Sequence, residues 1–353
     1  MSSMNSQRIH IFTNDYPGGW MPQDLETGLG GSEECIIGLA SALAKTGAEV
    51  IVWHTQPKPD SLFAPQTEYQ GVTYRHRELF TLEEVRDSTL ITWKDHSPHE
   101  AIRQQRIPCR HIHWTADVEP PWNVEGLDAY VCISKFHLNR TVWMPGWFNN
   151  GARFAFDFPL GVDLHHLMIH KQAKVPGTML YSDSPDRGLT PLLRNWPGIR
   201  SHFPLLKLRI TYGFDSFDRF SGLTPSARAL KDELVSLLRQ DGIEPLGRIS
   251  LDQMVEEYWK AQYWCLPLVK ADAALNSLNA QKAQLAGCIP VVNKFAALKE
   301  LVGPYIPFEE FCQGKTKVKD NDQPIPDPLT WDQIVKQYWI PVLMNLDSRR
   351  NAA

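Results

Sequence analysis

The alternation of short apolar runs with amphipathic segments is the feature that most constrains this chain. Runs such as "RIHIFTN" (8–14) and "EVIVWHT" (49–55) have the length and composition of buried strands, and a helical pattern over 30–47 separates them. Such alternation is typical of parallel sheets covered by helices. The pattern occurs in two successive series, so the sequence predicts an α/β protein with two doubly wound, Rossmann-like domains.

A joint between the two series sets the expected domain boundaries. The first series has predicted strands at 8–14, 49–55, 89–94, 110–115 and 129–134. The second has them in "TMLYSD", "LKLRITYG", "IEPLGRI", "YWCLPL" and "CIPVVN". Between the series, "FPLGVDLHHLMIHKQAKVPG" carries Pro and Gly at both ends, as loops do. We therefore expect domains at 1–160 and 161–328, and then a C-terminal helix within 329–353 that Pro341 kinks or ends.

Composition narrows the protein class. The 353 residues suit two domains better than one core. The net charge of −4 gives no general attraction to nucleic acid or anionic membrane. No apolar run reaches the ~18 residues of a membrane helix, and the N-terminal stretch lacks a signal-peptide apolar region. Six scattered cysteines without a CxxC pair favour a reduced, cytoplasmic setting, or the host cytoplasm for a viral protein. The oligomeric state is left open.

Three segments look suited to binding an anion. Gly30, Gly31 and Ser32 follow the first strand and open a helix, where glycine admits a ligand and the helix dipole favours negative charge. The spacing is not GxGxxG, so a dinucleotide fingerprint is not supported. In "YSDSPDRGLTPLLRNW", Arg187 and Gly188 open a helix, and arginine presents a planar fork to phosphate oxygens.

The third segment is "DAALNSLNAQKAQLAGCIPVVN" (272–293). A helix is predicted to begin at Asn276-Ser277 and to end at Gly287, before a buried strand. Its first turn offers backbone N–H groups to an anion. Asp272 is the only carboxylate of this stretch, and Lys282 lies inside the helix.

Taken in order, these segments resemble the donor half of retaining glycosyltransferases of family 4, which have the GT-B architecture. The matching stretches are "GLGGSEECIIGLASALAKTGAEVIVW", "DAYVCISKFHLNR", "FPLGVD", "YSDSPDRGL", "ITYGFDSF", "LGRISLDQMVEEYWKAQYWCLPL" and "AQKAQLAGCIPVV". The resemblance covers residues 8–345. It implies two domains facing across a cleft, with the last helix crossing back to the first domain. It also implies a nucleotide-diphosphate sugar (UDP-, GDP- or another) as the only cofactor.

The resemblance assigns roles to individual positions. Expected donor-binding residues are Gly30, Gly31, Ser32, Ser182, Asp186, Arg187, Gly188, Tyr212, Gly247, Arg248, Asn276, Ser277, Leu278 and Lys282. Expected catalytic residues are His113, Arg187 and Asp272, and expected acceptor-side residues are Lys94, Trp114 and Asp117. No DxD motif of metal-dependent sugar transferases is found, so no metal is expected.

The sequence departs from the family at two acidic positions. Its Glu-x7-Glu motif falls on Ala274 and Lys282, and lysine can only donate hydrogen bonds. Asp272, Asn276 and Asn279 are candidate replacements. Three explanations stay open: an altered donor, for example one with an extra anionic group; a loop in a different register; or a protein that no longer transfers sugar.

The leading hypothesis is a metal-independent glycosyltransferase that moves a sugar, hexose or pentose, to a saccharide with retention. A second hypothesis is a phage-type enzyme that glycosylates a modified DNA base, although the net charge of −4 does not favour DNA as a partner. A third is a non-catalytic relative that binds nucleotide sugars. The sequence leaves open the donor sugar, its base and the acceptor.

Overall fold

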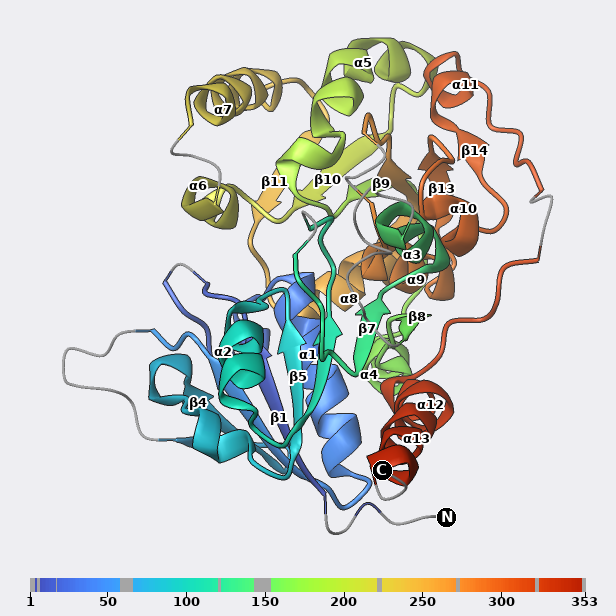
Figure 1. Ribbon diagram of the computed structural model, residues 1–353. Coiled ribbons are helices and arrows are strands. Elements are labelled where there is room, and N and C mark those ends of the chain that lie inside the picture. Colours follow the sequence, from blue (N-terminus) through green and yellow to red (C-terminus); the bar gives the residue numbers. More distant parts are fainter. Residues whose placement is uncertain are drawn as a thin grey trace. The chain divides into compact units, whose positions relative to one another are not determined.

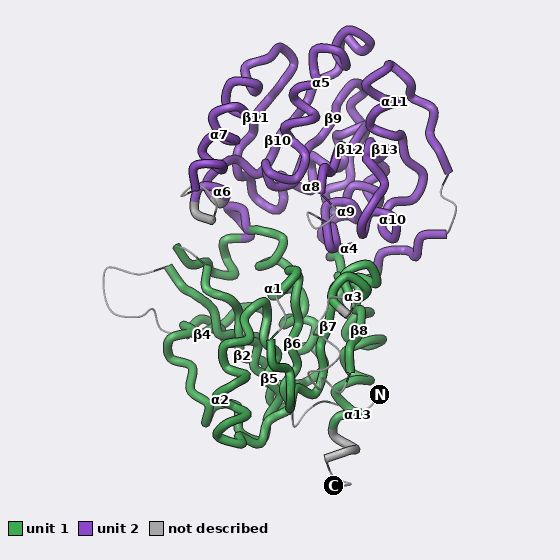
Figure 2. The backbone as a smooth tube through the Cα atoms, turned by 45° about the horizontal axis from the view of Figure 1, so that its top comes forward, with its two compact units in different colours: residues 1–24, 30–162, 329–353 green, residues 25–29, 163–328 purple. Residues whose placement is uncertain are grey.

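The chain divides into two compact units. The structure is a computed structural model that describes residues 4, 7–16, 18–57, 66–119, 122–142, 154–220, 224–270, 274–320 and 324–350. Unit 1 comprises Met1–Asp24, Gly30–Val162 and Leu329–Ala353, and unit 2 comprises Leu25–Leu29 and Asp163–Pro328 (Figure 2). The chain thus passes between units at Val162, two residues after the expected boundary, and a five-residue segment before Gly30 belongs to unit 2.

Unit 1 is built on an eight-stranded sheet in the order β3-β4-β2-β1-β5-β6-β7-β8 (Figure 1). Its strands are β1 (Arg8–Thr13), β2 (Glu49–His54), β3 (Thr67–Tyr69), β4 (Val72–His76), β5 (Thr89–Trp93), β6 (Arg110–Trp114), β7 (Ala129–Cys132) and β8 (Ala155–Asp157). All neighbours pair in parallel except β3 and β4. The central strands are buried along nearly their whole length, as in sheets covered on both faces. Sequence analysis missed β3, β4 and β8, which are short; β3 and β8 have no buried residue, whereas β4 alternates buried and half-buried positions.

Helices cover this sheet and complete its core. They are η1 (Pro22–Glu26), α1 (Gly31–Ala44), η2 (Arg77–Leu79), η3 (Leu82–Val85), α2 (Ser97–Gln105), α3 (Lys135–Val142), α12 (Trp331–Ile334), the π-helical η6 (Val335–Trp339) and α13 (Ile340–Arg350). Although η1 is short, its last two residues already lie in unit 2.

The C-terminal helices dock on unit 1 through Trp331. A Cβ atom added at Gly38 would lie 2.2 Å from Trp331 Nε1, and one at Gly161 would lie 2.7 Å from the same side chain. Only glycine therefore leaves room for this indole at both positions. Pro341 does not end the helix, which continues to Arg350. The π-helical turn Val335–Trp339 lies just before Pro341 and includes Gln337, four residues earlier. In a regular α-helix the carbonyl of that residue would clash with the proline ring.

Unit 2 is built on a six-stranded parallel sheet in the order β11-β10-β9-β12-β13-β14. Its strands are β9 (Val175–Tyr181), β10 (Lys207–Thr211), β11 (Ile243–Gly247), β12 (Ala261–Leu266), β13 (Ile289–Val292) and β14 (Ile306–Pro307). Its helices are α4 (Leu164–Ile169), η4 (Pro185–Arg187), α5 (Leu189–His202), α6 (Asp215–Phe220), α7 (Pro225–Leu237), α8 (Leu251–Lys260), α9 (Leu278–Leu285), α10 (Leu298–Leu301) and α11 (Phe308–Cys312). The predicted α/β fold with two parallel, Rossmann-like sheets is thereby confirmed.

Each sheet has a point where the strand order reverses. In unit 1 the chain builds outward from β1 on one side and from β5 on the other, and in unit 2 from β9 and from β12. Loops that leave the carboxyl ends of such neighbouring strands diverge, and open α/β sheets bind their ligands there. The two switch points are therefore the places where a ligand-binding site is expected in each unit.

All six cysteines are free, and all but Cys312 are buried. None of the helices in the described part of the chain combines the length and apolar character that crossing a lipid bilayer requires.

Candidate functional site

The loop after β9 makes a tight turn at the switch point of unit 2. Ser182 and Asp183 are buried, and the short helix η4 leads to Gly188, which has a left-handed φ of 119° and caps α5. A Cβ atom at Gly188 would lie 2.5 Å from the carbonyl oxygen of Pro267, which follows β12. Glycine therefore satisfies both an unusual backbone angle and the close approach of two loops.

Asn279 of α9 bonds both the loop after β9 and helix α8. Its Nδ2 donates to the carbonyl oxygen of Ser182 at 2.8 Å, and its Oδ1 accepts from the Tyr258 hydroxyl at 2.6 Å. Ser277 caps α9, with its hydroxyl accepting from the backbone of the first turn, and Asn276 Oδ1 accepts from the Ser277 N–H at 2.6 Å. The predicted helix start is thus confirmed, and the N-terminus of α9 is fixed against the end of β9.

Charged groups of this loop differ sharply in exposure. Asp186 and Arg187 are exposed, whereas Asp183 is buried and its Oδ2 has no hydrogen-bond partner. Burial raises the pKa of Asp183, although Arg187 and a hydrogen bond from Asn279 act in the opposite direction. The loop therefore combines a guanidinium open to a ligand with a buried carboxyl oxygen that lacks a donor.

Arg248 and Tyr212 lie at the ends of β11 and β10. The guanidinium carbon of Arg248 is 4.5 Å from the centre of the Tyr212 ring, and its Nη1 donates to the carbonyl oxygen of Leu29 at 2.9 Å. Tyr212 and Gly247 both have positive φ angles, of 94° and 70°. Arg248 thus fastens the 25–29 segment to unit 2, and its expected donor-binding role stays a prediction.

An acidic side chain, Glu33, lies in the first turn of α1. Gly30 caps the helix without a side-chain hydrogen bond, and Gly31 is exposed. A Cβ atom at Gly30 would lie 2.4 Å from Glu33 Oε2, whereas one at Gly31 would meet nothing within 4 Å. A carboxylate next to a helix N-terminus already interacts with the dipole that an anionic ligand would use. The anion role predicted for Gly30, Gly31 and Ser32 is therefore weaker than the sequence alone indicated.

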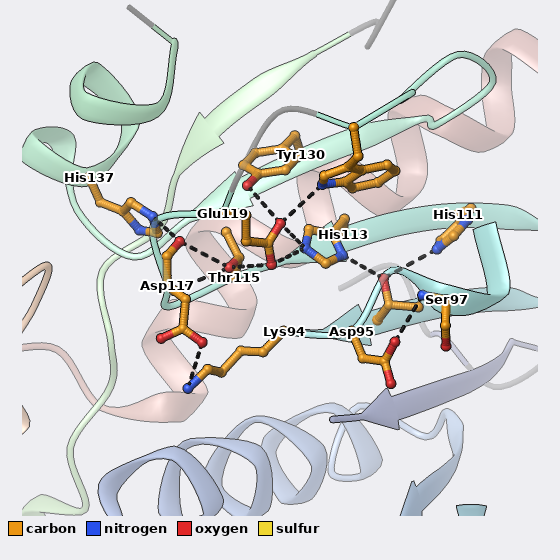
Figure 3. Close-up of polar contacts among 12 residues, drawn as sticks. Lys94, Asp95, Ser97, His111, His113, Thr115, Asp117, Glu119, Tyr130 and His137 are labelled. Atoms are coloured by element: carbon orange, nitrogen blue, oxygen red, sulfur yellow. Dashed lines mark hydrogen bonds and ion pairs between the residues drawn. The ribbon is translucent and has the colours of Figure 1, made fainter. Parts of the chain in front are cut away.

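The switch-point side of unit 1 holds a buried polar network around Glu119 (Figure 3). His113 is completely buried; its Nδ1 lies 2.8 Å from Thr92 Oγ1, and its Nε2 lies 3.0 and 3.1 Å from the two oxygens of Glu119. Three further groups donate to this carboxylate: Trp122 Nε1 at 3.1 Å, Tyr130 OH at 3.3 Å and Thr115 Oγ1 at 3.0 Å. The carboxylate is therefore satisfied within unit 1.

These contacts settle the charge of Glu119. Burial acts to raise its pKa, but the hydrogen bonds from His113, Trp122 and Thr115 outweigh burial and lower the pKa to about 2. An ionised carboxylate only accepts, so His113 Nε2 carries the shared hydrogen. With its ring buried and both nitrogens bonded, His113 has no nitrogen to offer a substrate. The sequence-based role of direct catalysis is corrected on this ground: His113 positions the 115–119 loop.

Glu119 itself was missed by sequence analysis, which named Asp117 as the acidic residue of this loop, on the acceptor side. Asp117 instead pairs with Lys94 Nζ at 2.9 Å, and its side chain is 56% exposed. Lys94 follows β5 and has a left-handed φ of 56°. Lys94 and Asp117 are thus brought together, as expected for neighbouring strand ends. The only available signal for Glu119 was its position six residues after His113.

Trp114 does not occupy the acceptor-side position that was expected. Its side chain is 1% exposed, and its ring centre lies 5.6 Å from that of Trp339 and 6.4 Å from that of Trp331. Trp93 packs against it at 4.0 Å. Trp114 therefore belongs to the core that receives the C-terminal helices.

The departures from the family motif have separate outcomes. Lys282 is buried on α9 and is not a solvated surface lysine. Ala274 and Leu278 are buried as well. Asp272, an expected catalytic residue, lies outside the described residues. The donor-binding roles of Lys282 and of the N-terminus of α9 stay predictions.

Comparisons with known proteins support this architecture. No protein-family model and no curated protein matches the sequence. Among solved structures, a sucrose-phosphate synthase from Thermosynechococcus elongatus matches with a TM-score of 0.61 at 14% identity, covering 87% of this chain and 88% of that one. An α,α-trehalose-phosphate synthase (UDP-forming) from Burkholderia vietnamiensis matches with a TM-score of 0.60 at 11% identity, covering 96% of both chains.

A third match is the catalytic domain of starch synthase IV from Arabidopsis thaliana, bound to ADP and acarbose. Its TM-score is 0.56 at 9% identity, and the alignment covers 97% of this chain and 92% of that one. At such identities the likeness is one of fold. With two parallel sheets and a C-terminal helix that belongs to unit 1, the chain has the GT-B fold of two Rossmann-like domains.

Proposed function

We propose that this protein transfers a sugar from a nucleotide-diphosphate donor to a saccharide acceptor, with retention and without a metal ion at the leaving group. The observation that carries the proposal is the switch point of unit 2, where exposed Arg187 stands beside the Gly188 turn and the start of α5. The fold supports the same reaction class, because the similar structures described above include a UDP-forming synthase and a starch synthase that holds ADP.

Sugar transfer from such a donor releases a diphosphate, whose growing charge must be stabilised. Arg187 presents planar N–H donors that match phosphate oxygens, and the first turn of the 14-residue helix α5 adds backbone N–H groups. Fixed donors of this kind stabilise charge without having to reorganise during the reaction. The close contact of Gly188 with Pro267 places the loop that leads to α9 against the same turn.

Asp183 supplies the carboxylate that the family motif lacks at Ala274 and Lys282. Its Oδ2 is buried without a hydrogen-bond partner, and an oxygen of this kind gains most from a ligand that brings a donor. Hydroxyl groups of the donor sugar or ribose are such donors. In this arrangement Asn279, which also bonds Ser182 and Tyr258, holds the loop that carries Asp183.

The acceptor side is proposed to lie in unit 1, where half-buried Lys94 pairs with exposed Asp117. These side chains follow adjacent strands, β5 and β6, and offer both hydrogen-bond donors and acceptors. A saccharide hydroxyl needs both kinds of partner. The buried Glu119 network supports this pair from below the surface, because Thr115 bonds both Glu119 and the Asp117 backbone N–H.

The experiment compares Arg187→Ala with the wild-type chain across UDP-, GDP-, ADP- and dTDP-sugars. Calorimetry measures donor binding, and chromatography measures release of the nucleoside diphosphate with and without acceptor saccharides. Arg194→Ala is the matched control, because Arg194 is an exposed arginine of α5 that pairs with Glu233. Loss of binding in Arg187→Ala alone supports the proposal.

Other outcomes separate the alternatives. Donor binding without any release of nucleoside diphosphate identifies a non-catalytic relative. Salt-sensitive binding to duplex DNA, with transfer to a modified base, identifies the DNA-directed enzyme instead. If no nucleotide sugar binds the wild-type chain, the proposal fails.

A further inference from the structure

Two histidines and one carboxylate converge where α4 meets α8 in unit 2. His166 Nε2 lies 2.6 Å from Asp252 Oδ1, and His170 Nε2 lies 3.4 Å from the same oxygen. One ligand atom from each residue lies within 4.8 Å of the others. Among the residues that the structure describes, this is the one group of three or more His, Cys, Asp or Glu side chains that meet so closely.

The backbone around this cluster is held in place by other contacts. His166 lies on α4 and His170 directly follows the helix as its C-cap, and their rings pack together with centres 5.0 Å apart. Asp163 caps α4 by accepting from the His166 backbone N–H at 2.9 Å, and Trp259 of α8 donates to the Leu167 carbonyl at 2.7 Å. The three side chains therefore project from two helices that are already fixed to each other.

The chemistry of the three groups matches a transition-metal ion. Zn²⁺ takes imidazole nitrogen and carboxylate oxygen at about 2.0–2.2 Å, which sets tetrahedral ligands roughly 3.3 Å apart. The observed separations bracket this value, and the side chains of His166, His170 and Asp252 are 20%, 23% and 64% exposed. All three side chains are at least partly exposed, so water can reach them as a fourth ligand.

The next acidic side chain along α8 is engaged elsewhere. Glu256, one turn beyond Asp252, pairs with Lys260 at 2.8 Å.

We propose that His166, His170 and Asp252 form a Zn²⁺ site that clamps α4 to α8. None of these residues is among the groups proposed to bind the sugar donor, so the site is independent of the metal-free transfer chemistry. Its role is to fix α4, the first helix after the chain enters unit 2 at Asp163.

The test uses the full chain, freed of metal with a chelator and then titrated with ZnCl₂. Mass spectrometry of the metal content is expected to give one Zn²⁺ per chain, and calorimetry its affinity. His166→Gln and Asp252→Asn are each expected to lower this affinity by more than the about 10- to 100-fold that loss of an outer-shell partner costs. Thermal melting with and without Zn²⁺ is expected to show stabilisation in the wild type and little in the variants.

His165→Gln is the matched control, because His165 is the exposed neighbour of His166 on α4 and is not part of the cluster. Co²⁺ in place of Zn²⁺ reports the ligand type, since bound thiolate adds an intense charge-transfer band that nitrogen and oxygen ligands lack. The proposal is overturned if the wild type binds no Zn²⁺ at micromolar concentration. It is equally overturned if His165→Gln weakens binding as much as His166→Gln, or if the Co²⁺ spectrum shows thiolate.

Discussion

The two switch points of this molecule share one topology but differ in how their polar groups are used. In unit 1, the buried His113 and Glu119 are bonded to each other, and half-buried Lys94 pairs with exposed Asp117. In unit 2, Arg187 is exposed and Asp183 keeps an oxygen without a donor. The same arrangement of parallel strands therefore holds its carboxylates in filled contacts in one unit, and in the other it leaves a charged group open and a buried carboxyl oxygen without a partner.

This difference predicts structural roles for the filled groups and binding roles for the unfilled ones. A buried group whose hydrogen-bonding capacity is filled contributes to stability, and its removal leaves partners unsatisfied. A group left unfilled in a folded protein raises the free energy of the unliganded state and gains when a ligand arrives. Substitutions in the buried Glu119 network should therefore act on folding, and substitution of the exposed Arg187 should act on binding.

The largest effect is expected for Glu119→Ala. Removal of this carboxylate leaves His113 and three other donors without their acceptor, and breaking a buried pair typically costs about 3–5 kcal/mol in the free energy of unfolding. Urea denaturation of the full chain measures it. Glu125→Ala is the control, because the Glu125 side chain is 70% exposed. Equal stability of the two variants would show that the network is not structural.

The pH dependence of Glu119 sharpens this prediction. Its pKa in the folded protein is lowered to about 2, from an ordinary 4.5, so the stabilisation is complete above pH 4.5 and is lost as the pH falls toward 2. The free energy of unfolding of the wild type should therefore drop over this window more steeply than that of Glu119→Gln. Parallel slopes would contradict the ionised state assigned to Glu119.

Arg187→Ala should act on binding and leave stability unchanged. Loss of a charge-assisted hydrogen bond weakens binding by roughly 1.5–3 kcal/mol, and the side chain is exposed in the free protein. Calorimetry with the preferred nucleotide sugar and thermal melting of the free chain measure the two quantities. A lower melting temperature of Arg187→Ala together with unchanged donor binding would mean that Arg187 has a structural role and not a binding role.

Asp183→Asn should raise stability while weakening donor binding. Burial raises the pKa of Asp183, so the folded state resists its ionisation, and stability falls as the pH rises above the ordinary value of 3.8. The neutral amide removes this penalty, for a gain of about 1 kcal/mol at pH 7 that disappears below pH 3.8. Asp186→Asn is the exposed control. Urea denaturation at pH 7 and below pH 3.8 measures the free energy of unfolding. An Asp183→Asn variant that is less stable than the wild type would mean that the carboxylate already has its hydrogen-bond partners.

The smallest effect is expected for the ion pair between Lys45 and Asp332, which joins α1 to α12 in unit 1. The Nζ–Oδ1 distance is 3.0 Å, but the side chains are 66% and 60% exposed. Exposed pairs contribute about 0–1 kcal/mol, so Lys45→Ala should change the urea midpoint little. A large loss would mean that charge, and not the packing of Trp331, holds the C-terminal helices in place.

Local chemistry explains what the sequence predicted well. The long central strands and the helix starts at Ser277 and Gly188 were identified because apolar runs, caps and turn residues act over a few residues. The three-residue strands β3 and β8 were missed because they have no buried residue and carry no such pattern. β4 does alternate, with Val72, Tyr74 and His76 buried, and this signal was overlooked. Pro341 was expected to interrupt its helix, which instead absorbs it with a π-helical turn.

Tertiary contacts explain what could not be predicted. The role of Glu119 depends on a loop that folds back onto His113, and that of Trp114 depends on helices more than two hundred residues away in sequence. The metal cluster joins residues 86 positions apart. Such contacts leave no periodic signal, and the burial of Lys282 on α9 is likewise set by packing that the sequence does not display.

The seating of Trp331 against Gly38 and Gly161 has a consequence for biosynthesis. These contacts belong to unit 1, yet Trp331 follows the whole of unit 2's main segment, Asp163–Pro328, in the chain. A ribosome therefore delivers every strand of unit 2 before it delivers the helix that completes the core of unit 1. Domains generally fold as they emerge, so the surface of unit 1 that receives Trp331 stays uncovered until unit 2 has been synthesised. During translation, a chaperone is therefore expected to bind unit 1.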